Sequence, residues 1–81
     1  IKVFGGAQQR PNLHIADMVD LYQLLLQLPD DAIAGEAFNA GYQNDTVAHI
    51  AATVRRVVQA EMPERGPIQI ETTTSDDPRS Y

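Results

Sequence analysis

The periodic segment TVAHIAATVRRVVQAEM (residues 46–62) constrains the fold of this 81-residue chain more than any other feature. Its apolar residues recur at i, i+3, i+4 and i+7, the spacing that places them on one face of an α-helix. We expect Asn44 or Asp45 to cap this helix, and Pro63 and Gly66 to end it. The apolar face consists of Val47, Ile50, Ala51, Val54, Val57, Val58 and Met62.

A second helix is predicted over residues 18–28, MVDLYQLLLQL. Asp17 is a plausible N-cap, and Asp20 in the first turn gives a weak capping box. Pro29 and the acidic residues 30–31 stop the helix. Because so many leucines share one helix, we expect it to be buried on more than one side. The apolar positions are Met18, Val19, Leu21, Tyr22, Leu24, Leu25, Leu26 and Leu28.

Strand-like segments surround these helices. Residues 1–6 combine β-branched and aromatic residues with two glycines that make a turn, and residues 12–15 alternate polar and apolar side chains after a proline. Residues 35–41 and 67–74 complete the set. The order β-β-α-β-α-β favours an α/β fold with some parallel pairing. The length allows one domain at most, over residues 1–81.

Composition excludes several classes of protein. Cysteine is absent, which removes disulfides and thiolate chemistry and fits a cytoplasmic protein. The net charge is −5 and the basic residues are mostly scattered, which argues against a nucleic-acid partner. The longest apolar runs fall far short of the ~20 residues of a membrane span, so a membrane role is not expected either.

Few residues offer catalytic or metal-binding chemistry. Both serines lie in the polar tail, far in sequence from the histidines, so a catalytic triad is not indicated. His14 and His49 are isolated, and we assign no metal ligands. The adjacent acids Asp76 and Asp77 have diverging side chains and are interpreted as solvated loop residues rather than an acid–base pair.

Arg10 is the exception, because it is the only positive charge between Lys2 and Arg55. It follows a glycine-bearing turn and precedes the segment that leads into the first helix. A guanidinium group suits phosphate, to which its planar fork can donate two parallel hydrogen bonds. A salt bridge with a nearby acid at the surface is the other interpretation. The residues themselves leave both open.

Three segments resemble one family. GGAQQRPNLHIADMVDLY resembles the G-x-x-x-x-R-x-x-x-H/Y-V-x-D-x-x-x-A segment of extended short-chain dehydrogenases/reductases, the group of nucleotide-sugar epimerases and dehydratases. EAFNAGYQNDTVAHIAATV is similar to the group's F-N-x-G and S/T-V-x-E-I-A region, and DDPRSY is similar to its tail segment. The three occur in the family's order, across nearly the whole chain.

The resemblance implies the C-terminal, substrate-side part of an NAD(P)-dependent enzyme. The family's glycine fingerprint and Tyr-x-x-x-Lys pair, which belong to its dinucleotide-binding domain, do not occur here. We therefore expect no catalytic residue and no NAD or NADP site in this chain, and no activity from it alone. The chain begins at Ile1 without an initiator Met, and we expect it to be a piece of a longer protein.

Three substrate-binding residues follow from the resemblance. Arg10 matches the arginine that contacts the diphosphate of the nucleotide sugar, and Asn39 matches the asparagine of the F-N-x-G strand, near the substrate groove. Many members carry a second phosphate-binding arginine before the tail segment, where this chain has TTTSDD. Arg79 lies a little later and is the candidate substitute. Asp17 matches a family aspartate at the helix start, which capping alone explains.

A non-catalytic interaction module is the alternative. The leucine-rich helix would then be the docking surface. If a partner domain is missing, Leu21, Leu24 and Leu28 lose their cover, and self-association of the isolated chain is expected. The two hypotheses differ in whether a nucleotide diphosphate perturbs Arg10.

Overall fold

The computed structural model describes residues 1–80, and Tyr81 lies outside the described part. The chain divides into two compact units. Unit 1 contains Ile1–Arg10 together with the chain from Asn44 onward, and unit 2 contains Pro11–Gln43. The described helices are too short or too polar to cross a membrane.

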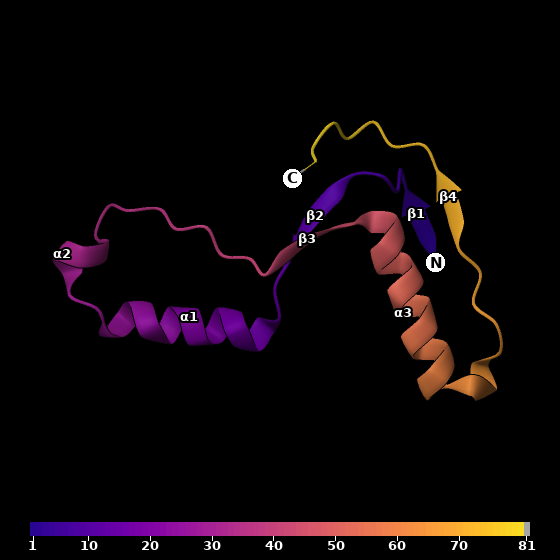
Figure 1. Cartoon of the computed structure of the whole chain (residues 1–81), viewed down its shortest axis with the longest axis horizontal. Coiled ribbons are helices and arrows are strands. Elements are labelled where there is room, and N and C mark those ends of the chain that lie inside the picture. The colour runs from indigo at the N-terminus through magenta and orange to yellow at the C-terminus, as the bar shows by residue number, and fades with distance from the viewer. Residues whose placement is uncertain (81) are drawn as a thin grey trace. The chain divides into compact units, whose positions relative to one another are not determined.

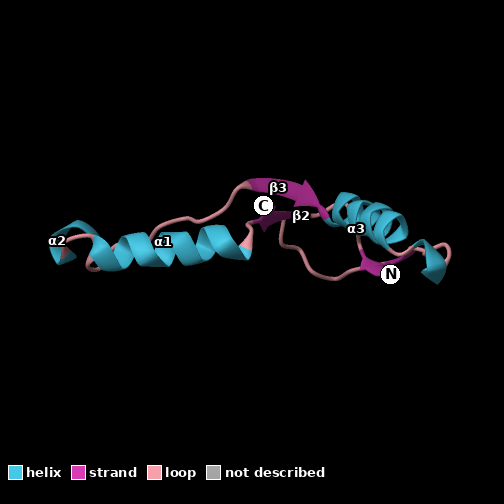
Figure 2. Cartoon of the chain, turned by 90° about the horizontal axis from the view of Figure 1, so that it is seen from below, coloured by secondary structure: helices cyan, strands magenta, loops and turns pink. Residues whose placement is uncertain are grey.

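The chain contains both helices and short strands (Figures 1 and 2), so the predicted mixed α/β class is confirmed. A short second helix and a 3-10 turn are additions that the sequence did not predict. In chain order the elements are β1 (Lys2–Phe4), β2 (Gln9–Asn12), α1 (Ile15–Gln27), α2 (Asp30–Ile33), β3 (Gln43–Thr46), α3 (Val47–Glu61), the 3-10 turn η1 (Pro63–Arg65) and β4 (Glu71–Thr73).

Unit 1 is built around a parallel strand pair and one helix. β1 and β4 pair in parallel, with Val3 opposite Thr72, which confirms the expected parallel pairing. Parallel strands need a long connection, and the chain through α3 provides it. α3 contacts β1, and the buried apolar residues of the described chain are Val3 and Ala51, at 3% and 6% exposed. The core of this unit is therefore very small.

The helix cap of α3 differs from the expectation. Thr46 is the N-cap, and its hydroxyl accepts a hydrogen bond from the backbone N–H of His49 at 3.1 Å. Capping by Asn44 or Asp45 was therefore wrong. The carboxylate of Asp45 instead accepts from the backbone N–H of Thr46 at 2.9 Å and lies 2.5 Å from His49 Nδ1. The C-terminal stop was right, because α3 ends at Glu61, just before Pro63.

The second and third strands lie elsewhere than predicted. β2 is Gln9–Asn12 rather than 12–15, and it pairs with β3 in a two-stranded sheet. Pro11 fits there because this sheet has only edge strands, where a missing N–H is tolerated. Residues 35–41 were expected to form a strand but do not, and β3 begins only at Gln43.

Unit 2 is dominated by α1, and the predicted helix there is confirmed with a different start. His14 caps it, because its Nδ1 accepts from the backbone N–H of Ala16 at 3.0 Å, so the expected cap at Asp17 was wrong. α1 ends at Gln27, and Asp30 then starts the short helix α2. None of the residues of α1, all of which are described, is buried. The chain does not provide the expected burial on more than one side.

Candidate functional site

Two of the three predicted substrate-binding residues come together in unit 1. Arg10 is the second residue of β2, and Arg79 lies in the C-terminal tail. Both bind the carboxylate of Asp77. Asn39 belongs to unit 2, where it is exposed in the segment after α2. The structure therefore assembles the two arginines within unit 1, while Asn39 belongs to the other unit.

The guanidinium group of Arg10 is held by the chain's own oxygen atoms. Its Nη2 lies 3.1 Å from Asp77 Oδ2. Its Nη1 donates to the carbonyl oxygens of Gln9 and Arg79, at 2.8 and 2.6 Å. The Arg10 side chain is 28% exposed, so it is mostly covered but still reaches solvent. These contacts fix the orientation of the guanidinium group, and its ion pair with Asp77 is a partly exposed salt bridge with an acid, the other interpretation that the sequence left open for Arg10.

Arg79 binds the same carboxylate in a bidentate arrangement. Its Nε donates to Asp77 Oδ1 at 2.9 Å and its Nη2 to Asp77 Oδ2 at 2.8 Å. Its backbone N–H also donates to Oδ1, at 3.0 Å. The Arg79 side chain is 71% exposed. Two parallel hydrogen bonds from one guanidinium to one carboxylate are among the strongest ion-pair geometries in proteins.

Asp77 is the residue that sequence reasoning missed. It was interpreted as a solvated loop acid; it does lie in a loop and is partly exposed, but its carboxylate joins two arginines that are far apart in the chain. The local sequence held part of the signal. An aspartate whose side chain accepts from the N–H two residues later forms a common turn, and Asp77 and Arg79 have this spacing. The contact with Arg10, 67 residues away, had no local signal.

The electrostatics of this Arg10–Asp77–Arg79 cluster favour an ionised Asp77. The side-chain hydrogen bonds from Arg79 lower the pKa of Asp77 the most, and the backbone N–H of Arg79 lowers it further. The positive charges of Arg79 and Arg10 act in the same direction, so the pKa of the carboxyl lies well below its usual range. Two guanidinium cations and one carboxylate leave one net positive charge in a chain that is otherwise acidic.

An open groove of about 650 Å³ in unit 1 adjoins the cluster, because Asp77 belongs to both. Residues 72–75, three threonines and a serine, supply one side of it. Their hydroxyl groups can both donate and accept hydrogen bonds. These residues are the TTTS segment of the sequence, and the structure makes it a wall of the groove. Gly5, Ala7 and Gln8 supply the other lining residues.

The double-glycine turn shapes that groove. Gly5 and Gly6 have φ values of +79° and +124°, which side chains other than hydrogen rarely allow. Gln8 ties the turn together, since its Oε1 accepts from the Gly6 N–H and its Nε2 donates to the Phe4 carbonyl, both at 2.6 Å. A Cβ atom on Gly5 would lie 2.6 Å from Gln8 Oε1. The predicted turn after the first strand is therefore present and tightly built.

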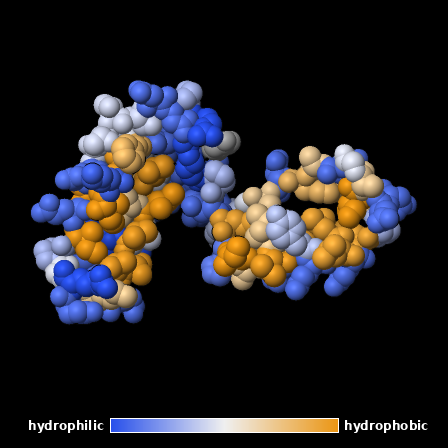
Figure 3. All heavy atoms as spheres, turned by 180° about the vertical axis from the view of Figure 1, so that it is seen from behind, coloured by the Kyte–Doolittle hydropathy of each residue, from blue (hydrophilic) through white to orange (hydrophobic). Residues whose placement is uncertain are grey.

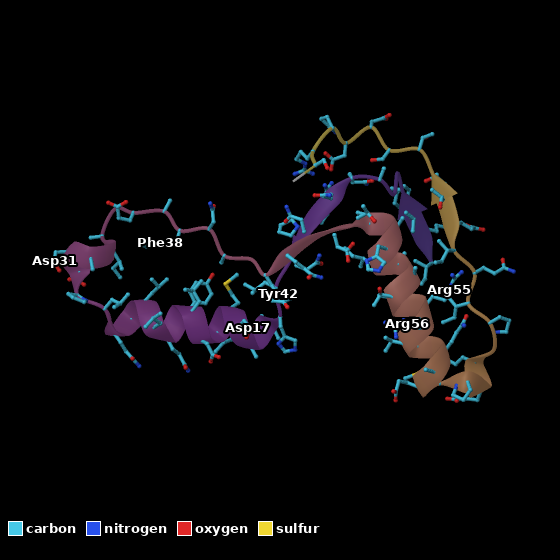
Figure 4. The ribbon with its side chains drawn as sticks, viewed as in Figure 1. Asp17, Asp31, Phe38, Tyr42, Arg55 and Arg56 are labelled. Atoms are coloured by element: carbon cyan, nitrogen blue, oxygen red, sulfur yellow. The ribbon has the colours of Figure 1, made fainter. Side chains whose placement is uncertain are left out.

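Unit 2 contains a second hollow, of about 480 Å³, beside the start of α1. Asp17 and Tyr42, both labelled in Figure 4, line it together with His14. His14 is occupied as a helix cap, and His49 of unit 1 pairs with Asp45. Among residues 1–80, no group of three or more histidine or acidic side chains is placed to hold a metal ion.

Comparison with family models, with curated proteins and with solved structures yields no match to this chain.

Proposed function

We propose that this chain is the substrate-side part of an NAD(P)-dependent nucleotide-sugar epimerase or dehydratase, and that it is inactive by itself. The observation that carries the proposal is the convergence of Arg10 and Arg79 on Asp77, next to a hydroxyl-lined groove. The resemblance of three sequence segments to extended short-chain dehydrogenases/reductases supports it independently. A cytoplasmic location is part of the same proposal.

The proposed ligand of the cluster is the diphosphate of a nucleotide sugar. A diphosphate offers the same planar pairs of oxygen atoms as the carboxylate of Asp77, with more negative charge. Asp77 holds both guanidinium groups in place before the ligand arrives. Like any aspartate with an ordinary or lowered pKa, Asp77 is ionised at neutral pH, so its carboxylate also repels an incoming phosphate. We therefore expect weak binding by this chain alone.

The groove next to the cluster suits the sugar half of such a ligand. Sugar hydroxyl groups need partners that both donate and accept, and residues 72–75 offer hydroxyl groups of that kind. Asn39 is assigned to the same substrate through the resemblance only. NAD or NADP, which supplies the hydride chemistry, belongs to a dinucleotide-binding domain outside this chain, because the glycine fingerprint and the Tyr-x-x-x-Lys pair do not occur in its sequence.

Titration with inorganic pyrophosphate and with uridine diphosphate, followed by the NMR signals of the arginine Nε–H groups, tests the diphosphate site. We expect the signals of Arg10 and Arg79 to shift, and Arg10→Ala to abolish the shift. Arg55→Ala is the matched control, because Arg55 is exposed on α3 in the same unit (Figure 4). The site is refuted if neither ligand moves the Arg10 signal, or if Arg55→Ala weakens binding as much as Arg10→Ala does.

A second variant tests the role given to Asp77. Asp77→Asn removes the competing negative charge but keeps the shape of the side chain, so we expect pyrophosphate to bind more tightly than to the wild type. Higher salt should weaken binding in both proteins, since the contacts are charge-driven. Weaker binding by Asp77→Asn would mean that the carboxylate is needed to orient the arginines more than it competes with the phosphate.

One observation favours the alternative, a non-catalytic interaction module. α1 has no buried residue; Leu24 within it is 52% exposed, and Leu28, which caps its C-terminal end, is 37% exposed. Such a helix gains stability when another surface covers it. In that function pyrophosphate and uridine diphosphate leave the Arg10 signals unchanged, so the same titration separates the two functions.

A further inference from the structure

α1 depends more on its own backbone and caps than on packing. None of its residues is buried, and Leu26 and Ile15 are 87% and 72% exposed. Seen from behind in Figure 3, apolar side chains of this helix lie at the surface. A helix of thirteen residues with so little packing is marginal in water. The contacts that satisfy its end groups therefore weigh heavily in whether it forms.

His14 makes the side-chain contact at the start of this helix. The backbone N–H of Ala16 donates to its Nδ1 at 3.0 Å. The backbone carbonyl of His14 also accepts from the N–H groups of Asp17 and Met18, at 3.0 and 3.2 Å, which any residue could do. The side-chain bond, in contrast, needs the lone pair of an unprotonated ring nitrogen. Because an imidazolium ion carries a proton on both ring nitrogens, this cap exists only while His14 is neutral.

A histidine cap responds to pH in a way that the usual caps do not. Serine, threonine and asparagine keep their acceptor oxygen atoms at every physiological pH. Histidine is the side chain whose charge ordinarily changes between about pH 5 and 8. A protonated His14 would also place a positive charge at the end of the helix dipole that favours negative charge. Both effects disfavour the helix when His14 is charged.

The groups that face His14 do not remove this sensitivity. Asp17 and Tyr42, labelled in Figure 4, line the same hollow as His14, and its other lining residues are uncharged. Between about pH 5 and 8 a tyrosine hydroxyl stays neutral and an aspartate stays ionised. The charge of Asp17, in the first turn, favours the helix and attracts an imidazolium ion. It offsets part of the loss, but it cannot restore an acceptor to the ring.

The other histidine of the chain, His49, responds in the opposite direction. It lies in the first turn of α3, and its Nδ1 is 2.5 Å from Asp45 Oδ2. Protonation of His49 gives that carboxylate a cation to pair with. The cap of α3 is the hydroxyl of Thr46, which accepts from the His49 backbone N–H whatever the charge of the ring. Mild acid therefore affects the start of α1 and leaves the cap of α3 in place.

We propose that His14 makes α1 a pH-sensitive element, a helix that forms while the imidazole is neutral and loosens as the pH falls from about 8 to about 5. The helical form holds fewer protons than the unwound form, so the stability of the helix decreases with decreasing pH. The hollow beside the start of α1 is lost with it, since His14 and Asp17 line that hollow. The proposal does not rest on the diphosphate site, which lies in unit 1.

The energy of a helix cap sets the expected size of the effect. Loss of a side-chain cap typically lowers the equilibrium constant for helix formation about fivefold. We expect the ratio of helical to unwound α1 to fall by about this factor between about pH 8 and 5. In a helix supported by burial such a change would pass unnoticed, but α1 has no buried residue.

NMR of the whole chain tests the hydrogen bond and its consequence together. At about pH 8 the nitrogen shifts of the His14 ring should place the proton on Nε2 and leave Nδ1 as the acceptor. As the pH is lowered to about 5, the Cα shifts of residues 19–25 should move toward coil values in step with protonation of His14. A proton on Nδ1 at the higher pH, or Cα shifts that stay constant while His14 titrates, overturns the proposal.

Three variants identify the group responsible. His14→Asn keeps a cap that does not titrate, so α1 should remain helical at both pH values. His14→Ala should lower the helix content at both, and His49→Gln should keep the wild-type pH dependence of α1. If His14→Asn loses helix in acid as the wild type does, another group controls α1 and the proposal is refuted. The pyrophosphate titration reports on Arg10 in unit 1, so its failure is distinct from a failure here.

Discussion

Units 1 and 2 contain similar proportions of regular structure but are stabilised in different ways. Unit 1 has both buried apolar residues, Val3 and Ala51, together with a parallel strand pair and the arginine cluster. Unit 2 has a longer run of leucine and no buried residue among those described. The apolar content of a segment therefore says little about whether its own chain covers it.

The difference lies in where the covering surface comes from. In unit 1, β1 and α3 are far apart in the sequence but contact each other, so each covers an apolar side of the other. In unit 2, α1 is followed only by a four-residue helix and an extended segment, which offer little surface. Unit 1 should thus respond mainly to changes inside it, and unit 2 to changes in what binds it.

The largest effect is expected in the core of unit 1. Val3→Asp places a carboxylate at a position that is 3% exposed. Burying an unpaired charge costs several kcal/mol, so we expect a loss of more than about 3 kcal/mol in the free energy of unfolding of unit 1. Amide hydrogen exchange of β1 and α3, followed by NMR, measures it.

Phe4→Asp is the matched control for that change. Phe4 is the next residue of the same strand and is 60% exposed, because neighbouring side chains on a strand point to opposite faces. We expect it to change hydrogen exchange only slightly. If both variants destabilise unit 1 equally, the very small core is not what holds it together, and the contrast between the units fails.

A smaller effect is expected at the start of α3. Thr46→Ala removes the hydroxyl that accepts from the His49 N–H, and loss of such a cap costs about 1 kcal/mol. Thr46→Ser keeps the hydroxyl and should restore most of that stability. Thermal unfolding followed by circular dichroism compares the three proteins. A loss that Ser does not restore would assign the role of Thr46 to its methyl group instead of its cap.

The sequence predicted the helices better than the strands, for a physical reason. A helix shows its periodicity within a few residues, so α1 and α3 appeared close to their true places. A short strand depends on a partner far away in the chain. The strands expected at 12–15 and 35–41 have the right local composition but no partner there, and pairing places β2 and β3 elsewhere. The predicted cap of α3 was wrong for the same reason, because the helix starts where β3 ends, at Thr46.

The candidate site was predictable to a similar degree. Arg10 stood out as an isolated positive charge in an acidic chain, whereas Arg79 was assigned only through the resemblance, and the structure brings the two together. Asp77 did not stand out, because adjacent acids in a polar tail are usually solvated. Its part in the cluster depends on the return of the tail to β2, a long-range contact that no local pattern contains.

The smallest effect on the stability of unit 1 is expected from the Arg10–Asp77–Arg79 cluster, and the dependence of stability on pH separates it from the other contributions. The pKa of Asp77 is lowered in the folded protein, so its unfolded state binds a proton at higher pH than the folded state does. The stability from the cluster is therefore fully present above the ordinary aspartate pKa of about 4 and declines as pH falls below it.

Asp77→Asn should remove this part of the acid sensitivity of unit 1, so wild type and variant should differ in stability at neutral pH and converge in acid. Asp76→Asn, at the adjacent exposed acid, should keep the wild-type dependence. Thermal unfolding from pH 7 downward decides the point, since a constant difference between wild type and Asp77→Asn at every pH would show that the two arginines do not stabilise the ionised carboxylate.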